Sequence, residues 1–146
     1  MFDIEFLSDE PEAQEGGWLG LRGVVTLGTE SEEFIAPLSL WSVERYQRHW
    51  IEAATRLAAG EERSAFFTSA FQFWWTMWQE EGDIRVHEEL LLPTQLDSLS
   101  ALPARAPVPY HLIGPYRRTT DEGEAISEWR LKAQDIEEFL VRRAAY

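Results

Sequence analysis

A run of phenylalanine and tryptophan side chains between residues 66 and 78 limits the fold of this chain more than any other segment. Its last part, from residue 74, reads WWTMWQ, so a strand here would place apolar side chains on both faces. Such a strand lies in the middle of a sheet, covered on one side by helices and on the other by a loop or a partner. The run is too short to be a membrane-spanning helix, which needs about 20 apolar residues. We therefore expect a central strand and a core that contains most of these rings.

The segments around this run have the alternation of further strands. Apolar and polar residues alternate over 2–6, and Leu19, Leu21, Val25 and Leu27 share one face of the next segment. Gly28 and the polar TESEE that follows predict a turn into FIAPL. Glu80, Glu81 and Gly82 predict a hairpin turn into a strand over 84–92. Two more strands are expected near 110–117 and 126–131.

Two segments have helical periodicity. Ser42 predicts the N-cap of a helix over 42–59 that ends before Gly60, because apolar residues recur there at steps of three and four. Asp135 and Glu138 resemble a capping box for a second helix over 134–145. The proline-rich stretch from Pro93 to Pro109 predicts a long loop. The pattern as a whole predicts the α+β class: a single domain over 1–146, with a mainly antiparallel β-sheet and two main α-helices packed on it.

Charge and cysteine content exclude several classes of protein. The 146 residues carry a net charge of −13 and contain no cysteine, so disulfides and thiol chemistry are excluded. The acids are concentrated in 1–33 and 61–90, and their field repels nucleic acid and anionic membranes. A basic protein would be attracted, although acidity can also serve solubility alone. The acidic N-terminus lacks the features of a signal peptide, so we expect a cytoplasmic protein.

The sequence contains little that predicts catalysis. It has no glycine-rich phosphate loop, no nucleophile elbow and no zinc-protease motif. His49, His87 and His111 do not have metal-ligand spacing. Glu80 and Glu81 could be imagined as the acid and base of a glycosidase with nearby tryptophans as sugar platforms, but adjacent acids at a turn are usually a solvated tip. We expect no enzyme activity, no catalytic residues, no metal and no cofactor.

The order of four segments resembles a known family. LRGVVTLGTESEEF, PLSLWSVERYQRHW, WTMWQEEGDIRVHEELLLP and ISEWRLKAQDIEEFL follow one another, from about Trp18 to Leu140. The most specific parts are the pair Trp41 and Trp50, the W-x-x-W segment that ends in Gly82 and Asp83, and the closing ISEW before Asp135. Together they resemble the immunity proteins of bacterial contact-dependent growth inhibition systems, the CdiI type.

The resemblance implies a role as a toxin inhibitor. Such a protein stays in the cytoplasm and binds the C-terminal toxin domain that a neighbouring cell delivers, here expected to be a nuclease with a basic substrate groove. An acidic surface complements such a groove and speeds association, and rings at the centre of the interface would prolong the complex. We expect a monomer that binds its toxin 1:1, without direct contact to nucleic acid or membrane.

The candidate partner-binding residues are the acids of the predicted hairpin and of a second turn. They are Glu80, Glu81, Asp83, Glu88, Glu89, Asp121, Glu122 and Glu124. We expect the first five to lie close together across the hairpin. Two other functions remain open: a non-catalytic carbohydrate- or peptide-binding module that uses exposed tryptophans, and, third in rank, a hydrolase.

Overall fold

The computed structural model describes residues 1–39, 41–68, 73–90, 108 and 110–144. In chain order the elements are β1 (Phe2–Phe6), β2 (Glu12–Ala13), β3 (Leu19–Leu27), β4 (Glu30–Pro37), α1 (Val43–Ala58), β5 (Arg63–Phe67), β6 (Phe73–Glu80), β7 (Asp83–Leu90), the 3-10 helix η1 (Tyr110–Leu112), β8 (Trp129–Lys132) and α3 (Ala133–Arg142). All strand pairs are antiparallel. This arrangement confirms the predicted α+β class.

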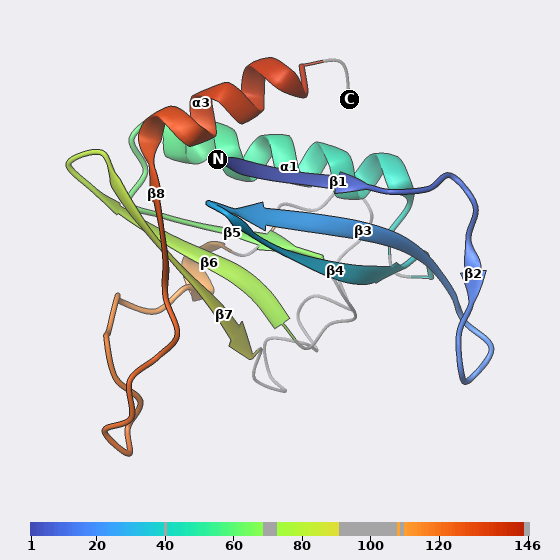
Figure 1. Cartoon of the computed structure of the whole chain (residues 1–146), viewed down its shortest axis with the longest axis horizontal. Coiled ribbons are helices and arrows are strands. Elements are labelled where there is room, and N and C mark those ends of the chain that lie inside the picture. The colour runs from blue at the N-terminus through green and yellow to red at the C-terminus, as the bar shows by residue number, and fades with distance from the viewer. Residues whose placement is uncertain (40, 69–72, 91–107, 109, 145–146) are drawn as a thin grey trace.

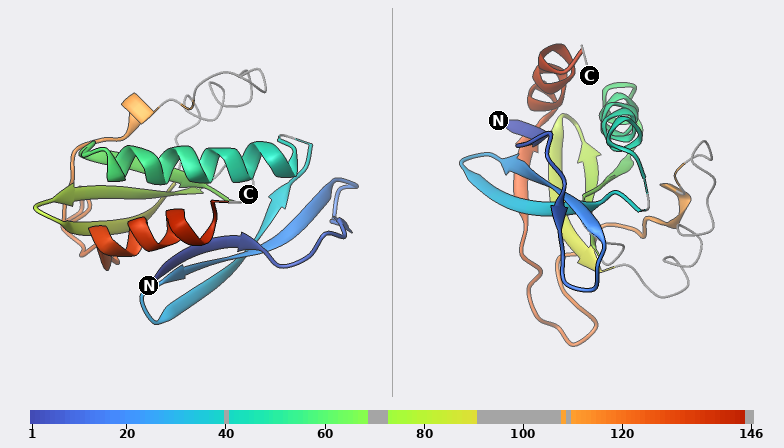
Figure 2. Two further views of the ribbon diagram at one scale, coloured as in Figure 1. Left: turned by 90° about the horizontal axis from the view of Figure 1, so that it is seen from above. Right: turned by 90° about the vertical axis from the view of Figure 1, so that its right-hand side faces the viewer.

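The strands form two sheets below a layer of two helices. In one sheet β3 lies between β1 and β4 and also pairs with β2, and in the other the order is β5, β6, β7, β8. Figures 1 and 2 show α1 and α3 side by side on the same side of the sheets. The two sheets and the helices enclose one continuous hydrophobic core.

The ring-rich strand lies where its pattern predicted. β6 pairs with β5 on one side and β7 on the other. Residues 74–78 are buried on both faces of the strand, and the most exposed of them, Trp78, is 7% exposed. Phe66 and Phe67 of β5 are buried as well. The prediction that most of these rings form the core is therefore confirmed; Phe71 lies outside the described residues.

The first helix also follows its sequence signals. The hydroxyl of Ser42 accepts a hydrogen bond from the backbone N–H of Arg45 at 3.1 Å, and Gly60 follows the C-terminus with a φ of 93°. Trp50, on the buried face, is fully buried and donates its indole N–H to the carbonyl of Phe67 at 2.7 Å. That bond ties α1 to the end of β5.

Several predicted boundaries were wrong. Most of TESEE belongs to β4, because a two-residue turn at Gly28 and Thr29 is enough to reverse the chain. The strand expected over 110–117 is absent: Tyr110–Leu112 forms η1, and side chains bind the next carbonyls in place of a strand partner. Arg63 donates to the carbonyl of Ile113 and Trp78 to that of Gly114.

The C-terminal part also begins differently from its prediction. β8 is shorter than the strand expected over 126–131 and ends at Lys132. The backbone N–H of Lys132 donates to Asp135 Oδ2 at 2.8 Å, so the helix cap lies three residues before Asp135 and not at it. The predicted loop from Pro93 to Pro109 lies outside the described residues, apart from Val108, which is buried.

Gly23 lets three strands pack closely in the first sheet. It lies in β3, paired with Phe6 of β1 and Phe34 of β4. A Cβ atom there would lie 2.4 Å from the ring of Phe34 and 2.8 Å from the carbonyl oxygen of Glu5, both shorter than any normal contact. Only glycine fits between this ring and this backbone.

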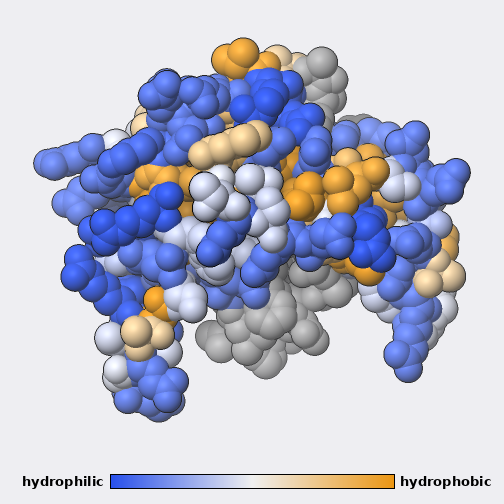
Figure 3. Space-filling model, in the orientation of Figure 1, coloured by the Kyte–Doolittle hydropathy of each residue, from blue (hydrophilic) through white to orange (hydrophobic). Residues whose placement is uncertain are grey.

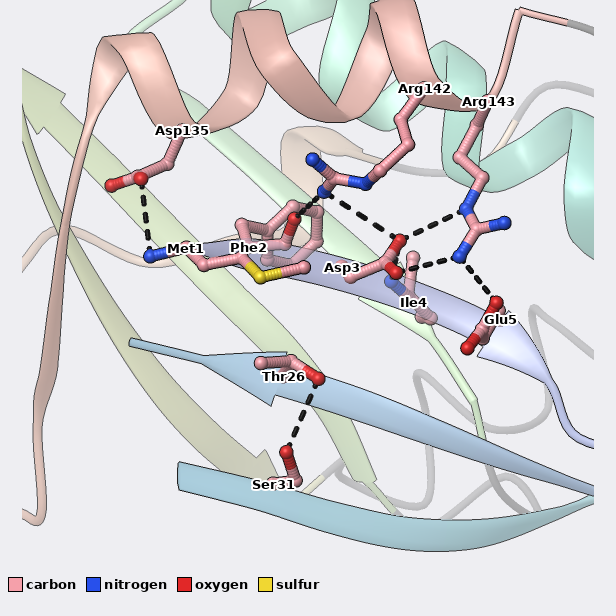
Figure 4. Close-up of polar contacts among 10 residues, drawn as sticks. All are labelled: Met1, Phe2, Asp3, Ile4, Glu5, Thr26, Ser31, Asp135, Arg142 and Arg143. Atoms are coloured by element: carbon pink, nitrogen blue, oxygen red, sulfur yellow. Dashed lines mark hydrogen bonds and ion pairs between the residues drawn. The ribbon is translucent and has the colours of Figure 1, made fainter. Parts of the chain in front are cut away.

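Polar contacts hold α3 to the first strand (Figure 4). The guanidinium of Arg143, just after α3, makes hydrogen bonds to both carboxylate oxygens of Asp3 and a further one to Glu5. The N-terminal amine lies 3.2 Å from Asp135 in the first turn of the helix. Both ends of the helix are therefore fixed to β1.

Candidate functional site

The turn between β6 and β7 carries exposed acidic side chains, as predicted. Glu80 pairs with Asp83, which leaves Glu81 and Gly82 as a two-residue turn. Both have positive φ, 52° and 84°, as the type I′ turn of a hairpin requires. Glycine and asparagine adopt this conformation readily, and glutamate does not. The chain thus holds an acidic side chain where the backbone disfavours one.

The charges of this hairpin tip are not equivalent. Lys132 of β8 forms a hydrogen bond and an ion pair with Asp83. These contacts lower the pKa of the Asp83 carboxyl below its ordinary value. Among the described residues, neither Glu80 nor Glu81 has an ion-pair partner. The uncompensated negative charge of the tip therefore belongs to Glu80 and Glu81.

A hollow of about 560 Å³ opens beside the tip. It is lined by Glu62, Arg63, Trp78, Gln79, Glu80, Glu81, Asp83, Arg85 and Tyr116. The guanidinium of Arg85 lies 4.7 Å from the ring centre of Tyr116, and that of Arg63 is bound to a backbone carbonyl. Both arginines are thus engaged in contacts with residues of the hollow or beside it. The carboxylates of Glu80 in β6 and Asp83 in β7 also line the hollow and can receive a basic group.

The expectation that Glu88 and Glu89 lie close to the tip was wrong. They pair with Trp75 and Trp74, at the opposite end of the hairpin from Glu80 and Asp83. At about 3.3 Å per residue, the strand carries them roughly 15–20 Å away from the tip. Since the two strands are fully paired, no bend brings the ends together.

Glu88 instead meets a carboxylate of the other sheet. Burial raises the pKa of Glu88, and so do the negative charge of Glu32 in β4 and a hydrogen bond with it. A hollow of about 230 Å³ lies between β4 and β6–β7 and is lined by Val25, Glu32, Glu33, Phe34, Thr68, Trp75 and Glu88. The first four residues of β4, ESEE, are all polar and do not alternate, and their assignment to a turn hid these acids.

The second predicted acidic turn stands apart from both places. Asp121, Glu122 and Glu124 are exposed on a turn that a bridge between Thr119 and Ala125 closes. Figure 1 shows this segment projecting from the end of β8 opposite to the hairpin tip. Arg117 pairs with Asp121 at 3.1 Å. The candidate residues thus do not form one surface, although Arg117 lies near Glu89 as well as near Asp121.

A buried polar network connects β7 to the segment before β8. His87 Nε2 lies 3.1 Å from Glu128 Oε1, which also accepts a hydrogen bond from the hydroxyl of Tyr116. Although burial raises the pKa of Glu128, the bonds from Tyr116 and His87 outweigh it and leave the pKa lowered. His87 Nδ1 lies 3.8 Å from Glu89. His87 and Glu89 are two residues apart and therefore share one face of β7, whereas no local pattern indicates Glu128.

The other two histidines lie in α1 and η1. His49 is fully buried, accepts a hydrogen bond from the backbone N–H of Phe67 at 3.0 Å and lies 3.2 Å from the hydroxyl of Tyr110. Burial, with a smaller effect of Arg45, lowers the pKa of His49 to about 3. His111 is exposed. Within the described residues no three His, Asp or Glu side chains are grouped so as to hold a metal ion.

The surface favours contacts with a polar partner. On the face shown in Figure 3, hydrophilic side chains predominate, and apolar ones gather beneath the helices. None of the helices in the described parts of the chain is long and apolar enough to cross a membrane. The arrangement can therefore attract cationic groups at several places.

The chain is similar to known proteins in sequence and in fold. The chain matches the family model of the CdiI N-terminal domain over residues 36–139. Its fold is similar to a chain from the solved "CdiA-CT/CdiI toxin and immunity complex from Enterobacter cloacae", with a TM-score of 0.82, 20% sequence identity and full coverage of both chains. No curated protein matches the sequence.

Proposed function

The chain belongs to the CdiI N-terminal domain family, and we propose on this ground that it is an immunity protein that binds and neutralises the C-terminal toxin domain of a CdiA effector. The match over residues 36–139 is the observation that carries the proposal. The similar solved chain comes from a CdiA-CT/CdiI toxin and immunity complex. The inhibitor acts in the cytoplasm, as a monomer, by 1:1 binding and without catalysis.

The toxin domain that fits this surface best is a nuclease. An enzyme that binds a polyanion needs a basic groove, and this chain has a net charge of −13. Acidic residues opposite such a groove raise the association rate above the ordinary 10⁵ to 10⁶ M⁻¹s⁻¹ or so. The positive φ of Glu81 supports a binding role for the hairpin tip, because backbone strain is concentrated at functional sites.

The alternative of a carbohydrate- or peptide-binding module required exposed tryptophans. Of the seven, Trp41, Trp50, Trp74, Trp75 and Trp78 are buried, and Trp18 and Trp129 are half-buried. Trp129 also donates its indole N–H to Glu30. The tryptophans therefore offer no open aromatic platform for a sugar or peptide. The same burial argues against the glycosidase hypothesis, which needed nearby tryptophans to bind sugar.

The proposal is tested with the C-terminal domain encoded by the reading frame directly upstream of this chain. Cells that express this domain should stop growing, and co-expression of the chain should restore growth. The two purified proteins should elute as one 1:1 complex in size-exclusion chromatography. An unrelated toxin domain serves as the control for specificity.

Failure to restore growth together with failure to form a complex would overturn the proposed function. The nature of the toxin is tested separately, by incubating the domain with RNA and with DNA in the presence and absence of the chain. A domain that cleaves neither would overturn the assignment to a nuclease and leave the immunity function standing.

A further inference from the structure

The outer edge of β4 is an open strand edge. Within the described part of the chain β4 pairs with β3 alone. Its two-residue turn to β3 makes Leu27 and Glu30 a hydrogen-bonded pair, and alternate residues of β4 then bond inward to β3. The backbone N–H of Gly28 donates to the carbonyl of Met1 on the other side of β3, which confirms this alternation of inward and outward hydrogen bonds.

The register therefore fixes which backbone groups face outward. Ser31, Glu33 and Ile35 direct their N–H and C=O groups away from β3. Pro37 ends this row, because it has no N–H and its carbonyl accepts a hydrogen bond from the hydroxyl of Tyr46 at 2.8 Å. Ser31 and Glu33 are exposed and Ile35 is half-buried. The edge thus offers up to three donors and three acceptors to an added strand.

The side chains along this edge select a basic occupant. Glu30, Glu32 and Glu33 follow one another closely, and within the described residues the nearest base, Arg22, pairs with Glu33 at 3.6 Å and with Glu12. If β4 paired with β4 of a second copy, the acids of the two strands would lie opposite one another. Their repulsion disfavours such a dimer. A strand with lysine or arginine at alternate positions would meet opposite charge.

A hollow of about 230 Å³ beside the edge fits the side chain of such a strand. It is lined by the aromatic residues Phe34 and Trp75 and by the acids Glu32 and Glu88. Aromatic walls accept the methylene stem of a long basic side chain, and the two carboxylates accept its charged head. Glu32 and Glu88 are both acids in contact with each other. A cation between them would reduce the repulsion between their carboxyl groups.

We propose that the outer edge of β4 takes up an extended, lysine- or arginine-bearing segment of the toxin domain as an added strand, with one basic side chain in the hollow beside it. The inference rests on the proposed function and names the site of contact. It differs from the hairpin tip, which lies at the other end of the β6–β7 hairpin from Glu88.

Two substitutions of Glu33 distinguish the contribution of its backbone N–H to binding from that of its side chain. Glu33→Pro removes an outward N–H that β3 does not use, and proline is accepted at such positions of edge strands. Glu33→Gln removes the same charge and keeps the N–H. Measured by calorimetry with the upstream-encoded toxin domain, Glu33→Pro should weaken binding roughly tenfold more than Glu33→Gln. Equal affinities of the two folded variants would overturn the inference.

Amide exchange of the unmodified chain gives an answer that does not depend on any variant folding. In the free protein the amides of Ser31, Glu33 and Ile35 should exchange quickly, and those of Glu32 and Phe34 slowly. In the complex the first three should become protected. A complex that forms without this protection overturns the inference and leaves the proposed function intact, whereas absence of any complex overturns both.

Discussion

Arg143 and Asp3 are joined by two parallel hydrogen bonds across nearly the whole length of the chain: Nε to Oδ1 at 3.0 Å and Nη2 to Oδ2 at 2.6 Å. Asp3 is only 7% exposed, so this arginine replaces hydrogen bonds that water would otherwise make. Bidentate guanidinium–carboxylate pairs are among the strongest polar contacts in proteins. The pair fixes the end of α3 to the first strand.

Asp3→Ala should lower the free energy of unfolding by about 3–5 kcal/mol, because it leaves a part-buried arginine without its main partner. Urea unfolding followed by tryptophan fluorescence measures the change. Asp9→Ala removes an exposed carboxylate and should change stability by less than about 0.5 kcal/mol. Similar values for both variants would show that the pair does not hold α3.

Trp50→Ala should cost about 3–5 kcal/mol, since it removes a fully buried ring and the hydrogen bond from its indole to Phe67. The measurement is again urea unfolding, and Trp50→Phe, which keeps an aromatic ring, should cost less. A loss below about 1 kcal/mol for Trp50→Ala would mean that this ring does not belong to the core.

Glu81→Asn should raise the free energy of unfolding by about 0.5–1 kcal/mol, because asparagine adopts positive φ more readily than glutamate. Thermal unfolding measures the gain. The same variant should associate more slowly with the toxin domain, so that stability and binding change in opposite directions. A variant that is both more stable and equally fast would indicate that the glutamate has no role in association.

Changing Glu80 and Glu81 together to glutamine should slow association severalfold at low salt and flatten its salt dependence. Asp83 is left unchanged, because its removal would also leave Lys132 without a partner. Stopped-flow mixing at several salt concentrations measures the rate. The double variant Glu122→Gln and Glu124→Gln makes the same charge change on the other turn. An effect of the second pair alone would move the steering site to residues 121–124.

Acid should destabilise the protein in a window set by His49. Its pKa is about 3 in the folded state and about 6.5 in the unfolded chain, so the unfolded state binds the extra proton first. Stability from this group is complete above pH 6.5 and is lost as the pH falls toward 3. Between pH 7 and pH 5 the loss should be about 2 kcal/mol.

His49→Gln should flatten that pH dependence, since glutamine keeps an acceptor for Phe67 and does not titrate. Urea unfolding at pH 5, 6 and 7 measures it. His111→Gln is the matched control, because His111 is exposed and should leave the slope unchanged. An unchanged slope in the His49 variant would contradict the assignment.

Local patterns in the sequence predicted most of the elements. Ser42 and Gly60 marked the first helix, and Glu80, Glu81 and Gly82 marked the hairpin, because caps and tight turns depend on a few neighbouring residues. The strand expected over 110–117 failed because long side chains from the second sheet bind its carbonyls. No local pattern contains such distant partners.

The candidate site was predicted only in part. The turn signal at Glu80, Glu81 and Gly82 correctly placed the acids at a tip, but the distance from the tip to Glu88 follows from the strand register. The contact between Glu32 and Glu88 joins two sheets, and nothing in either segment indicates the other. The toxin-binding role of these acids remains a prediction.

Gly23 is a position of the first sheet that cannot accept another residue. Any side chain there would push Phe34 or the backbone of Glu5 aside, so substitution would open the sheet from within. The side chains of Ser31 and Glu33, three residues and one residue before the glycine's partner Phe34 in β4, are exposed and are not restricted in this way. The outward-facing residues of β4 can therefore be exchanged to give a new binding specificity. Gly23 in the neighbouring strand keeps the geometry of the sheet unchanged, so immunity to a changed toxin need not require a changed fold.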